Sequence, residues 1–95
     1  MEVLRPKEMD THPGDSLVRW ARRQLEIARD ILDNPGGGLL FATQTIGQVR
    51  AALSERDAER WEYLVVLLGR AEDAAVRREF GTAGQLLDEA SGKLG

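Results

Sequence analysis

The residues best suited to bind an anion are four arginines in one predicted helix: Arg19, Arg22, Arg23 and Arg29. Guanidinium groups bind phosphates and carboxylates in a bidentate geometry, so this cluster could contact a nucleic-acid backbone or an anionic ligand. Glu26 and Asp33 follow Arg22 and Arg29 by four residues, a spacing at which ion pairs form along a helix. The pattern therefore favours a solvated, internally paired helix face, with phosphate contact as the alternative.

Other residue types that carry chemistry are sparse. The chain has no cysteine and a single histidine, His12, which excludes a thiol nucleophile and a zinc–thiolate site. The carboxylate pairs Glu72–Asp73 and Asp88–Glu89 are adjacent in sequence and point about 100° apart on a helix, so neither pair can share a proton. The glycine-rich stretch 34–38 follows a helix and lacks a phosphate-binding lysine. We expect no catalytic site, no cofactor and no metal, and hence a protein that is not an enzyme.

Composition narrows the class of protein further. The chain has 95 residues, 42% of them hydrophobic and 31% charged, which is the size and composition of one small globular domain. Its net charge of −3 argues against a general nucleic-acid coat, because such proteins carry a net positive charge. The longest wholly apolar run, residues 64–68, is far short of a membrane span, and the N-terminus lacks the apolar stretch of a signal peptide. We expect a cytoplasmic protein.

The periodicity of the apolar residues predicts an all-α fold, a small antiparallel bundle of about four helices. The predicted helices cover about residues 16–33, 39–53, 55–79 and 82–92, and the single bundle domain spans 14–95 after a loose N-terminal arm, 1–13. The stretch 34–38 ends the first helix, because proline cannot continue a helix and glycine permits a left-handed exit turn. Two later breaks are predicted, with a cap in the sequence Ser54–Asp57 and another at Thr82. A helix that continues across Ser54–Asp57 is the alternative to the first break.

Two of these helices have apolar residues over more than one narrow stripe. The first helix is apolar over about half its circumference, including Trp20, so we expect it to contact at least two other helices. Trp61 falls on an apolar face of the third helix, and both tryptophans are expected in the core, with a partner surface as the alternative. Residues 63–69 are apolar on all sides of the helix, and a buried strand at 63–68 is the competing interpretation.

The distribution of charge suggests a binding surface for a protein. Residues 34–49 carry no charge, and neither do residues 63–69, whereas each helix of an isolated bundle should keep a charged outer side. We therefore expect self-association or a protein partner at a surface on the second and third helices: Phe41, Thr45, Gln48, Ala52, Tyr63, Val66 and Leu67. In the alternative interpretation the N-terminal arm, with Val3, Leu4 and Met9, covers this surface.

These observations lead to three functional hypotheses in order of preference. The first is a non-enzymatic adaptor, a regulatory or assembly subunit, or a small inhibitor that acts by protein–protein contact. The second is a helical accessory subunit of a nucleoprotein complex, with the four arginines on phosphate, and its binding would depend strongly on salt. The third is a small all-helical enzyme or ligand-binding protein.

Overall fold

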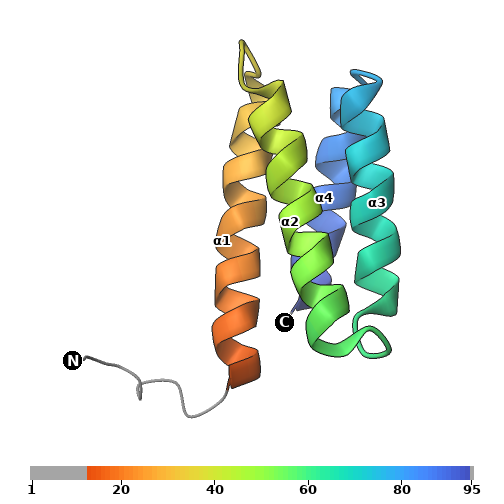
Figure 1. Cartoon of the computed structure of the whole chain (residues 1–95). Helices are drawn as coiled ribbons and strands as arrows, with labels where there is room; N and C mark the ends of the chain where they lie inside the picture. The colour runs from red at the N-terminus through yellow and green to blue at the C-terminus, as the bar shows by residue number, and fades with distance from the viewer. Residues whose placement is uncertain (1–12, 95) are drawn as a thin grey trace, which may run out of the picture.

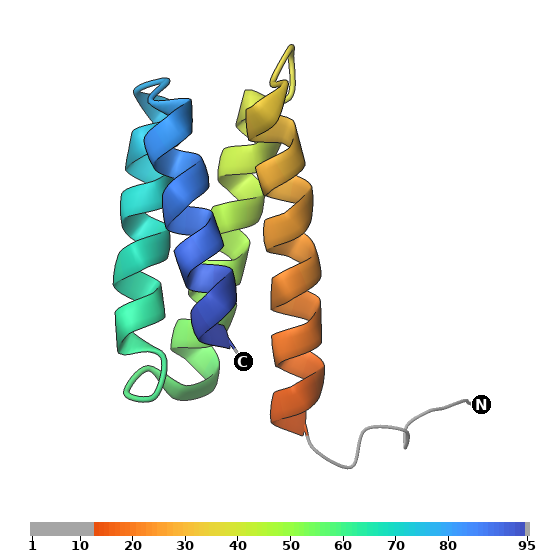
Figure 2. The same cartoon turned by 180° about the vertical axis from the view of Figure 1, so that it is seen from behind.

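The computed structural model describes residues 13–94, which form four α-helices: α1 (Pro13–Asp33), α2 (Leu39–Asp57), α3 (Glu62–Val76) and α4 (Phe80–Leu94). Successive helices run in opposite directions and lie side by side (Figure 1). α1 packs against α2, α2 against α3, α3 against α4, and α4 closes the ring by packing against α1 (Figures 1 and 2). The predicted small all-α bundle is therefore confirmed, and α1 contacts two neighbours as expected.

The core runs along the centre of this ring. Each helix contributes small or aliphatic residues three or four positions apart, the spacing that places side chains on one side of a helix. The seam of α2 contains Ala42, Ile46, Val49 and Leu53, all fully buried. The largest fully buried side chains of the bundle are Leu25, Ile46, Val49, Leu53, Leu67, Leu68 and Leu87. Residues 63–68 lie within α3 without a break, so the alternative of a strand there is wrong.

α1 begins earlier than predicted. Its first residue is Pro13, a residue common in the first turn of helices because its missing N–H would have no intrahelical partner there. Residues 1–12 of the predicted N-terminal arm, which include Val3, Leu4, Met9 and His12, lie outside the described residues. The end of α1 matches the prediction: the chain turns through 34–38, and Gly36 has a positive φ of 49°.

The connection between α2 and α3 lies four residues beyond its predicted position. α2 continues through Ser54–Asp57, and the chain turns at residues 58–61. The Asp57 carboxylate accepts a hydrogen bond from the backbone N–H of Arg60 (3.1 Å), so this acid stabilises the turn. The side chain of Trp61 then enters the bundle and is only 6% exposed. Burial of this indole fixes the start of α3, and Ser54 is not the cap.

The connection between α3 and α4 lies before its predicted position. The backbone N–H of Arg78 donates to the carbonyl of Ala75 (3.0 Å), and that of Glu79 donates to the carbonyl of Ala74 (2.8 Å). These two bonds, with a φ of 64° at Arg78, form a Schellman motif that ends α3. Thr82 is therefore inside α4 instead of capping it, and α4 extends from Phe80 to Leu94.

Arg78 occupies a position that favours glycine, and replacing it should stabilise the fold. In a left-handed conformation the Cβ of an L-residue collides with the backbone, so Arg78→Gly is expected to raise the free energy of unfolding by about 1 kcal/mol. The matched control is Arg77→Gly, which removes the same charge at a φ of −81° and should lower stability by roughly 0.5–1 kcal/mol. Urea denaturation measures both, and stabilisation by both variants, or by neither, would contradict this assignment of strain.

Candidate functional site

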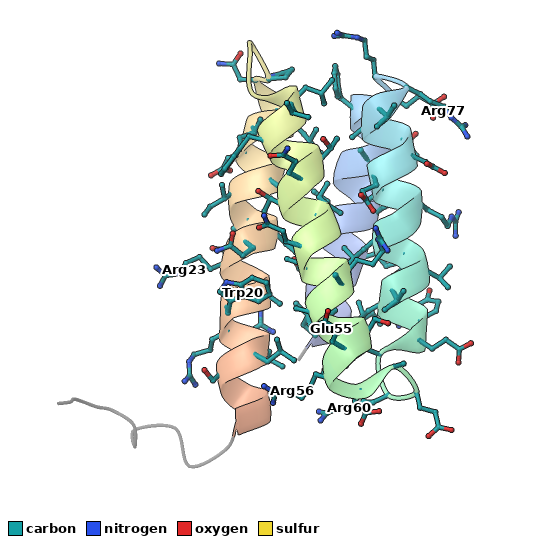
Figure 3. The ribbon with its side chains drawn as sticks, in the orientation of Figure 1. Trp20, Arg23, Glu55, Arg56, Arg60 and Arg77 are labelled. Carbon is teal, nitrogen blue, oxygen red and sulfur yellow. The ribbon has the colours of Figure 1, made fainter. Side chains whose placement is uncertain are left out.

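The most distinctive surface of the bundle lies over the seam between α1 and α2. At 100° per residue, Trp20 and Ile27 lie on the side of α1 opposite Arg29, which pairs with Asp88 of α4. They therefore flank α2. Both side chains are 38% exposed, although both are large and apolar. Figure 3 shows Trp20 on the front of α1.

α2 completes this surface from its side of the seam. Phe41 and Gln48 lie opposite Arg50, which pairs with Glu72 of α3, so they flank α1. Phe41 is 56% exposed, a large fraction for a side chain of this size. We define the α1/α2 face by its partly or fully exposed uncharged residues: Trp20, Gln24, Ile27, Phe41, Gln48 and Ala52.

The structure places two of the predicted interface residues in the core. Thr45 and Leu67 are each only 2% exposed, so neither is available to a partner, and their prediction as surface residues is wrong. Both sit at the edge of the core stripe of their helix, where a neighbouring helix covers them. The pattern of charge in the sequence cannot distinguish a side chain covered by a neighbour from one that awaits a partner.

The other predicted interface residues lie in three places instead of one. Phe41, Gln48 and Ala52 belong to the α1/α2 face. Tyr63 is on the α4 side of α3: its hydroxyl donates to the carboxylate of Glu89 (2.7 Å), and Lys93 Nζ is 5.7 Å from its ring centroid. Val66, 52% exposed, lines a shallow groove of about 480 Å³ between α2 and α3. The predicted surface is therefore not continuous.

The contact between Tyr63 and Glu89 gives a prediction on pH. The hydrogen bond and the negative charge of Glu89 favour the neutral phenol and raise the pKa of Tyr63 above its ordinary value. A raised pKa in the folded state means that this contribution to stability is present below the pKa of the unfolded chain and is lost as the pH rises through the folded pKa. Tyr63 is the only tyrosine of the chain, so the tyrosinate absorbance at about 295 nm follows the ionisation of this residue alone.

We expect Glu89→Gln to lower the pKa of Tyr63 in this titration, because the amide lacks the negative charge. Glu79→Gln serves as the control, since Glu79 follows the opposite end of α3, and it should leave the midpoint unchanged. An unchanged midpoint in Glu89→Gln would contradict the contact.

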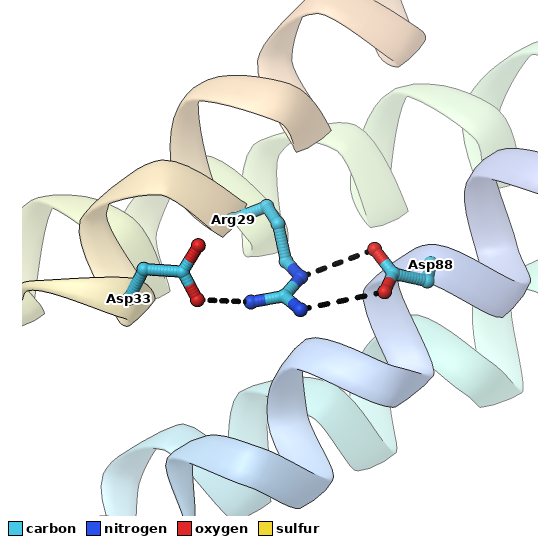
Figure 4. Close-up of polar contacts among 3 residues, drawn as sticks. All are labelled: Arg29, Asp33 and Asp88. Carbon is cyan, nitrogen blue, oxygen red and sulfur yellow. Dashed lines mark hydrogen bonds and ion pairs between the residues drawn. The ribbon is translucent and has the colours of Figure 1, made fainter.

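The predicted anion-binding arginines fall into two groups. Arg19, Arg22 and Arg23 line a shallow hollow of about 190 Å³ on the outer side of α1, together with Glu26. Arg29 instead lies between α1 and α4, where its guanidinium group pairs with two carboxylates, Asp33 and Asp88 (Figure 4). The structure therefore brings three of the four arginines together and does not include Arg29 in their surface.

Arg29 and its carboxylate partners form an ion-pair cluster that joins two helices of the bundle. Arg29 Nε is 3.1 Å from Asp88 Oδ1, and the hydrogen bond to Asp88 raises the pKa of the guanidinium group. The group lies across Gly84, where a Cβ atom would come within 2.8 Å of Arg29 Cζ. The arrangement uses Arg29 to join α1 to α4, so we do not assign it to an external phosphate.

A similar ion pair joins α2 to α3. Arg50 Nε is 2.7 Å from Glu72 Oε1, and a Cβ atom on Gly47 would come within 2.8 Å of the Glu72 carboxylate. Ion pairs and the Tyr63–Glu89 hydrogen bond thus cross the α1/α4, α2/α3 and α3/α4 seams. Over the α1/α2 seam the exposed residues are uncharged from Phe41 to Ala52, whereas Glu55 and Arg56 of α2 are exposed at its lower end (Figure 3).

Three of the four carboxylates that are adjacent in sequence contact side chains of neighbouring helices. Glu72 pairs with Arg50, Asp88 with Arg29, and Glu89 with Tyr63. Among residues 13–94, no three potential metal ligands gather at one point. Within the same residues, none of the helices combines the length and the apolar character needed to cross a membrane.

The favoured prediction of Trp20 in the core is wrong, and Ile27 is not among the predicted surface residues. The signal that could have found them is their position on the helical wheel. They lie at one edge of the wide apolar arc of α1, more than 130° from Leu25 near the other edge on an ideal wheel of about 100° per residue. A helix with two neighbours covers the middle of such an arc and leaves one edge exposed.

Comparisons with known proteins do not assign this site. No protein-family model, no curated protein and no solved structure matches the chain.

Proposed function

We propose that this protein acts by protein–protein contact through the α1/α2 face, as an adaptor, a regulatory or assembly subunit, or a small inhibitor. The observation that carries the proposal is the exposure of the large apolar side chains Trp20, Ile27 and Phe41 along the seam between α1 and α2. Contiguous apolar patches of about 300–600 Å² on a monomer often mark binding sites, and tryptophan is enriched among residues that dominate binding energy.

The size of the exposed side chains supports this proposal. A tryptophan or phenylalanine buries about 150–250 Å² when it is fully covered, so Trp20 and Phe41 each leave on the order of 100 Å² uncovered. At about 25 cal/mol per Å², covering each of them would stabilise a complex by roughly 2–3 kcal/mol. The polar residues among them, Gln24 and Gln48, are neutral, so a partner would bury no unpaired charge on this face.

Two further parts of the proposal concern catalysis and the cellular compartment. We propose a contact without catalysis, because Arg29, Arg50 and Tyr63 are each engaged by a carboxylate of a neighbouring helix. We also propose the cytoplasm as the compartment, on the basis of a composition without cysteine.

The experiment is affinity capture from the source cells with a tagged full chain in three forms: unchanged, Phe41→Glu and Leu40→Glu. Leu40 is the matched control, because it is also exposed (68%) in the first turn of α2 but points away from α1. A partner that binds the unchanged and Leu40→Glu chains should lose affinity for Phe41→Glu by roughly thirtyfold or more once purified. A partner that binds all three forms equally would contradict the proposal.

The arginines give the same experiment a second outcome. Arg19, Arg22 and Arg23 surround one hollow on α1, an arrangement that could contact phosphate. Nucleic acid that is captured in a salt-dependent manner, and lost when these three residues are changed to glutamate, would favour the nucleoprotein role over the α1/α2 face.

A further inference from the structure

We propose that the partner of the α1/α2 face is a second copy of this chain, packed with its α1 helix antiparallel, so that Arg23 of each copy meets Asp30 of the other. This inference rests on the proposed function, because it names the occupant of the same face. Three features support it: the placement of charge on α1, the chemistry of the polar residues, and the area of the face.

The charges on α1 suit an antiparallel pair of copies. Arg23 and Asp30 are both exposed and seven residues apart, so they lie on one strip of α1 with Ile27 beside them near the midpoint. Figure 3 shows Arg23 projecting from the bundle at the outer border of the α1/α2 face. Within residues 13–94, no ion pair engages either side chain.

A two-fold axis near Ile27 would place Arg23 of one copy opposite Asp30 of the other, twice in each dimer. The two charges on one helix are about 10 Å apart along the axis, at 1.5 Å per residue, so both pairs can form at once. A parallel arrangement of the α1 helices would instead bring Arg23 against Arg23 and Asp30 against Asp30, and like charges repel. The charge pattern therefore selects the antiparallel arrangement.

The polar residues of the face also suit contact with a second copy. Gln24, Gln48 and the neighbouring exposed Gln44 carry primary amides, which both donate and accept hydrogen bonds. Each amide can therefore satisfy either a donor or an acceptor of the second copy. Because residues 34–49 contain no charge, the net charge of −3 on each chain adds no repulsion at this part of α2.

The area of the face is sufficient for a weak dimer. α1 and α2 have 21 and 19 residues, so each is about 30 Å long, and two packed helices are about 20 Å wide with their side chains. The side of the bundle formed by α1 and α2, with the α1/α2 face at its middle, thus offers on the order of 600 Å² per copy, and a dimer that used all of it would bury on the order of 1,200 Å² in total. This lies at the lower limit of specific interfaces, so we expect a dimer that dissociates at micromolar concentration.

Sedimentation equilibrium of the full chain, from low micromolar to submillimolar concentration, tests this inference. The unchanged chain should show a monomer–dimer equilibrium. Phe41→Glu should raise the dissociation constant by roughly thirtyfold or more, while Leu40→Glu should leave it unchanged. Circular dichroism of each variant confirms that the helices are retained.

A charge exchange tests the antiparallel arrangement itself. Arg23→Asp and Asp30→Arg should each weaken the dimer by roughly three- to tenfold, because each puts like charges opposite one another. The double variant restores opposite charges at both places and should return the dissociation constant close to that of the unchanged chain. Dimerisation that depends on Phe41 without rescue by the double variant would overturn the antiparallel pairing.

A monomer at all concentrations would overturn the second copy as the occupant. In that case the capture experiment still decides the proposed function, because a different protein that is lost with Phe41→Glu would support the function and leave only the inference refuted.

Discussion

Trp61→Ala is expected to lower the free energy of unfolding by about 3–5 kcal/mol, the usual cost of removing a buried tryptophan. The indole is only 6% exposed and lies where the chain enters α3, so its loss would leave a cavity at the end of the bundle. The guanidinium group of Arg60, 4.5 Å from the ring centroid, would also lose its aromatic partner. In a domain of this size the melting temperature should fall by roughly 12–40 °C.

Trp20→Ala is the matched control for this prediction. It removes the same side chain from a position that is 38% exposed, and alanine favours the helix, so we expect a smaller loss, of about 1–2 kcal/mol. Thermal and urea denaturation of both variants give the comparison. Equal losses from the two variants would show that the two tryptophans are not buried to different extents.

Leu67→Ala is expected to cost about 2–5 kcal/mol, because Leu67 is only 2% exposed and packs in the core. Its neighbour Val66 is 52% exposed, and Val66→Ala should change stability by no more than about 0.5 kcal/mol. The pair matters because the charge pattern of the sequence assigns both residues to one interface. Urea denaturation separates them, and a large loss from Val66→Ala at a concentration where the chain is monomeric would contradict the burial that distinguishes them.

These stability variants complement the binding variants. Trp61 and Leu67 support the fold and should affect binding only by unfolding the chain. Phe41 is half exposed, so Phe41→Glu should weaken association while the helices and the melting temperature of the monomer are retained. A variant that lost both properties together would not identify a binding surface.

The sequence by itself determined the number and type of the elements. Apolar residues three and four apart predict four helices, and they mark the buried seam of α2 correctly at Ala42, Ile46, Val49 and Leu53. The turn after α1 follows from its proline and glycines, because these residues act on the local backbone whatever surrounds them. Such features depend on short-range sterics and hydrogen bonds, which neighbouring residues decide.

The other two turns depend on more than local signals. The chain turns after Asp57 because the buried indole of Trp61 sets the start of α3, and it turns at Arg78 although that position favours glycine. The acids and Ser54 resemble a helix start, but packing of Trp61 into the bundle outweighs a cap contribution of about 1 kcal/mol.

Only the tertiary structure decided which apolar residues stay exposed. Periodicity gives the direction of a side chain on its own helix, but the rotation of each helix against its neighbours decides what covers it. Thr45 and Leu67 therefore become part of the core, whereas Trp20 and Ile27 remain on the surface. The same rotation turns Arg29 toward Asp88 of α4 and leaves Arg23 on the outer side of α1 (Figures 3 and 4). The candidate site thus depends on how the helices pack, because each of its side chains is exposed where no neighbouring helix covers it.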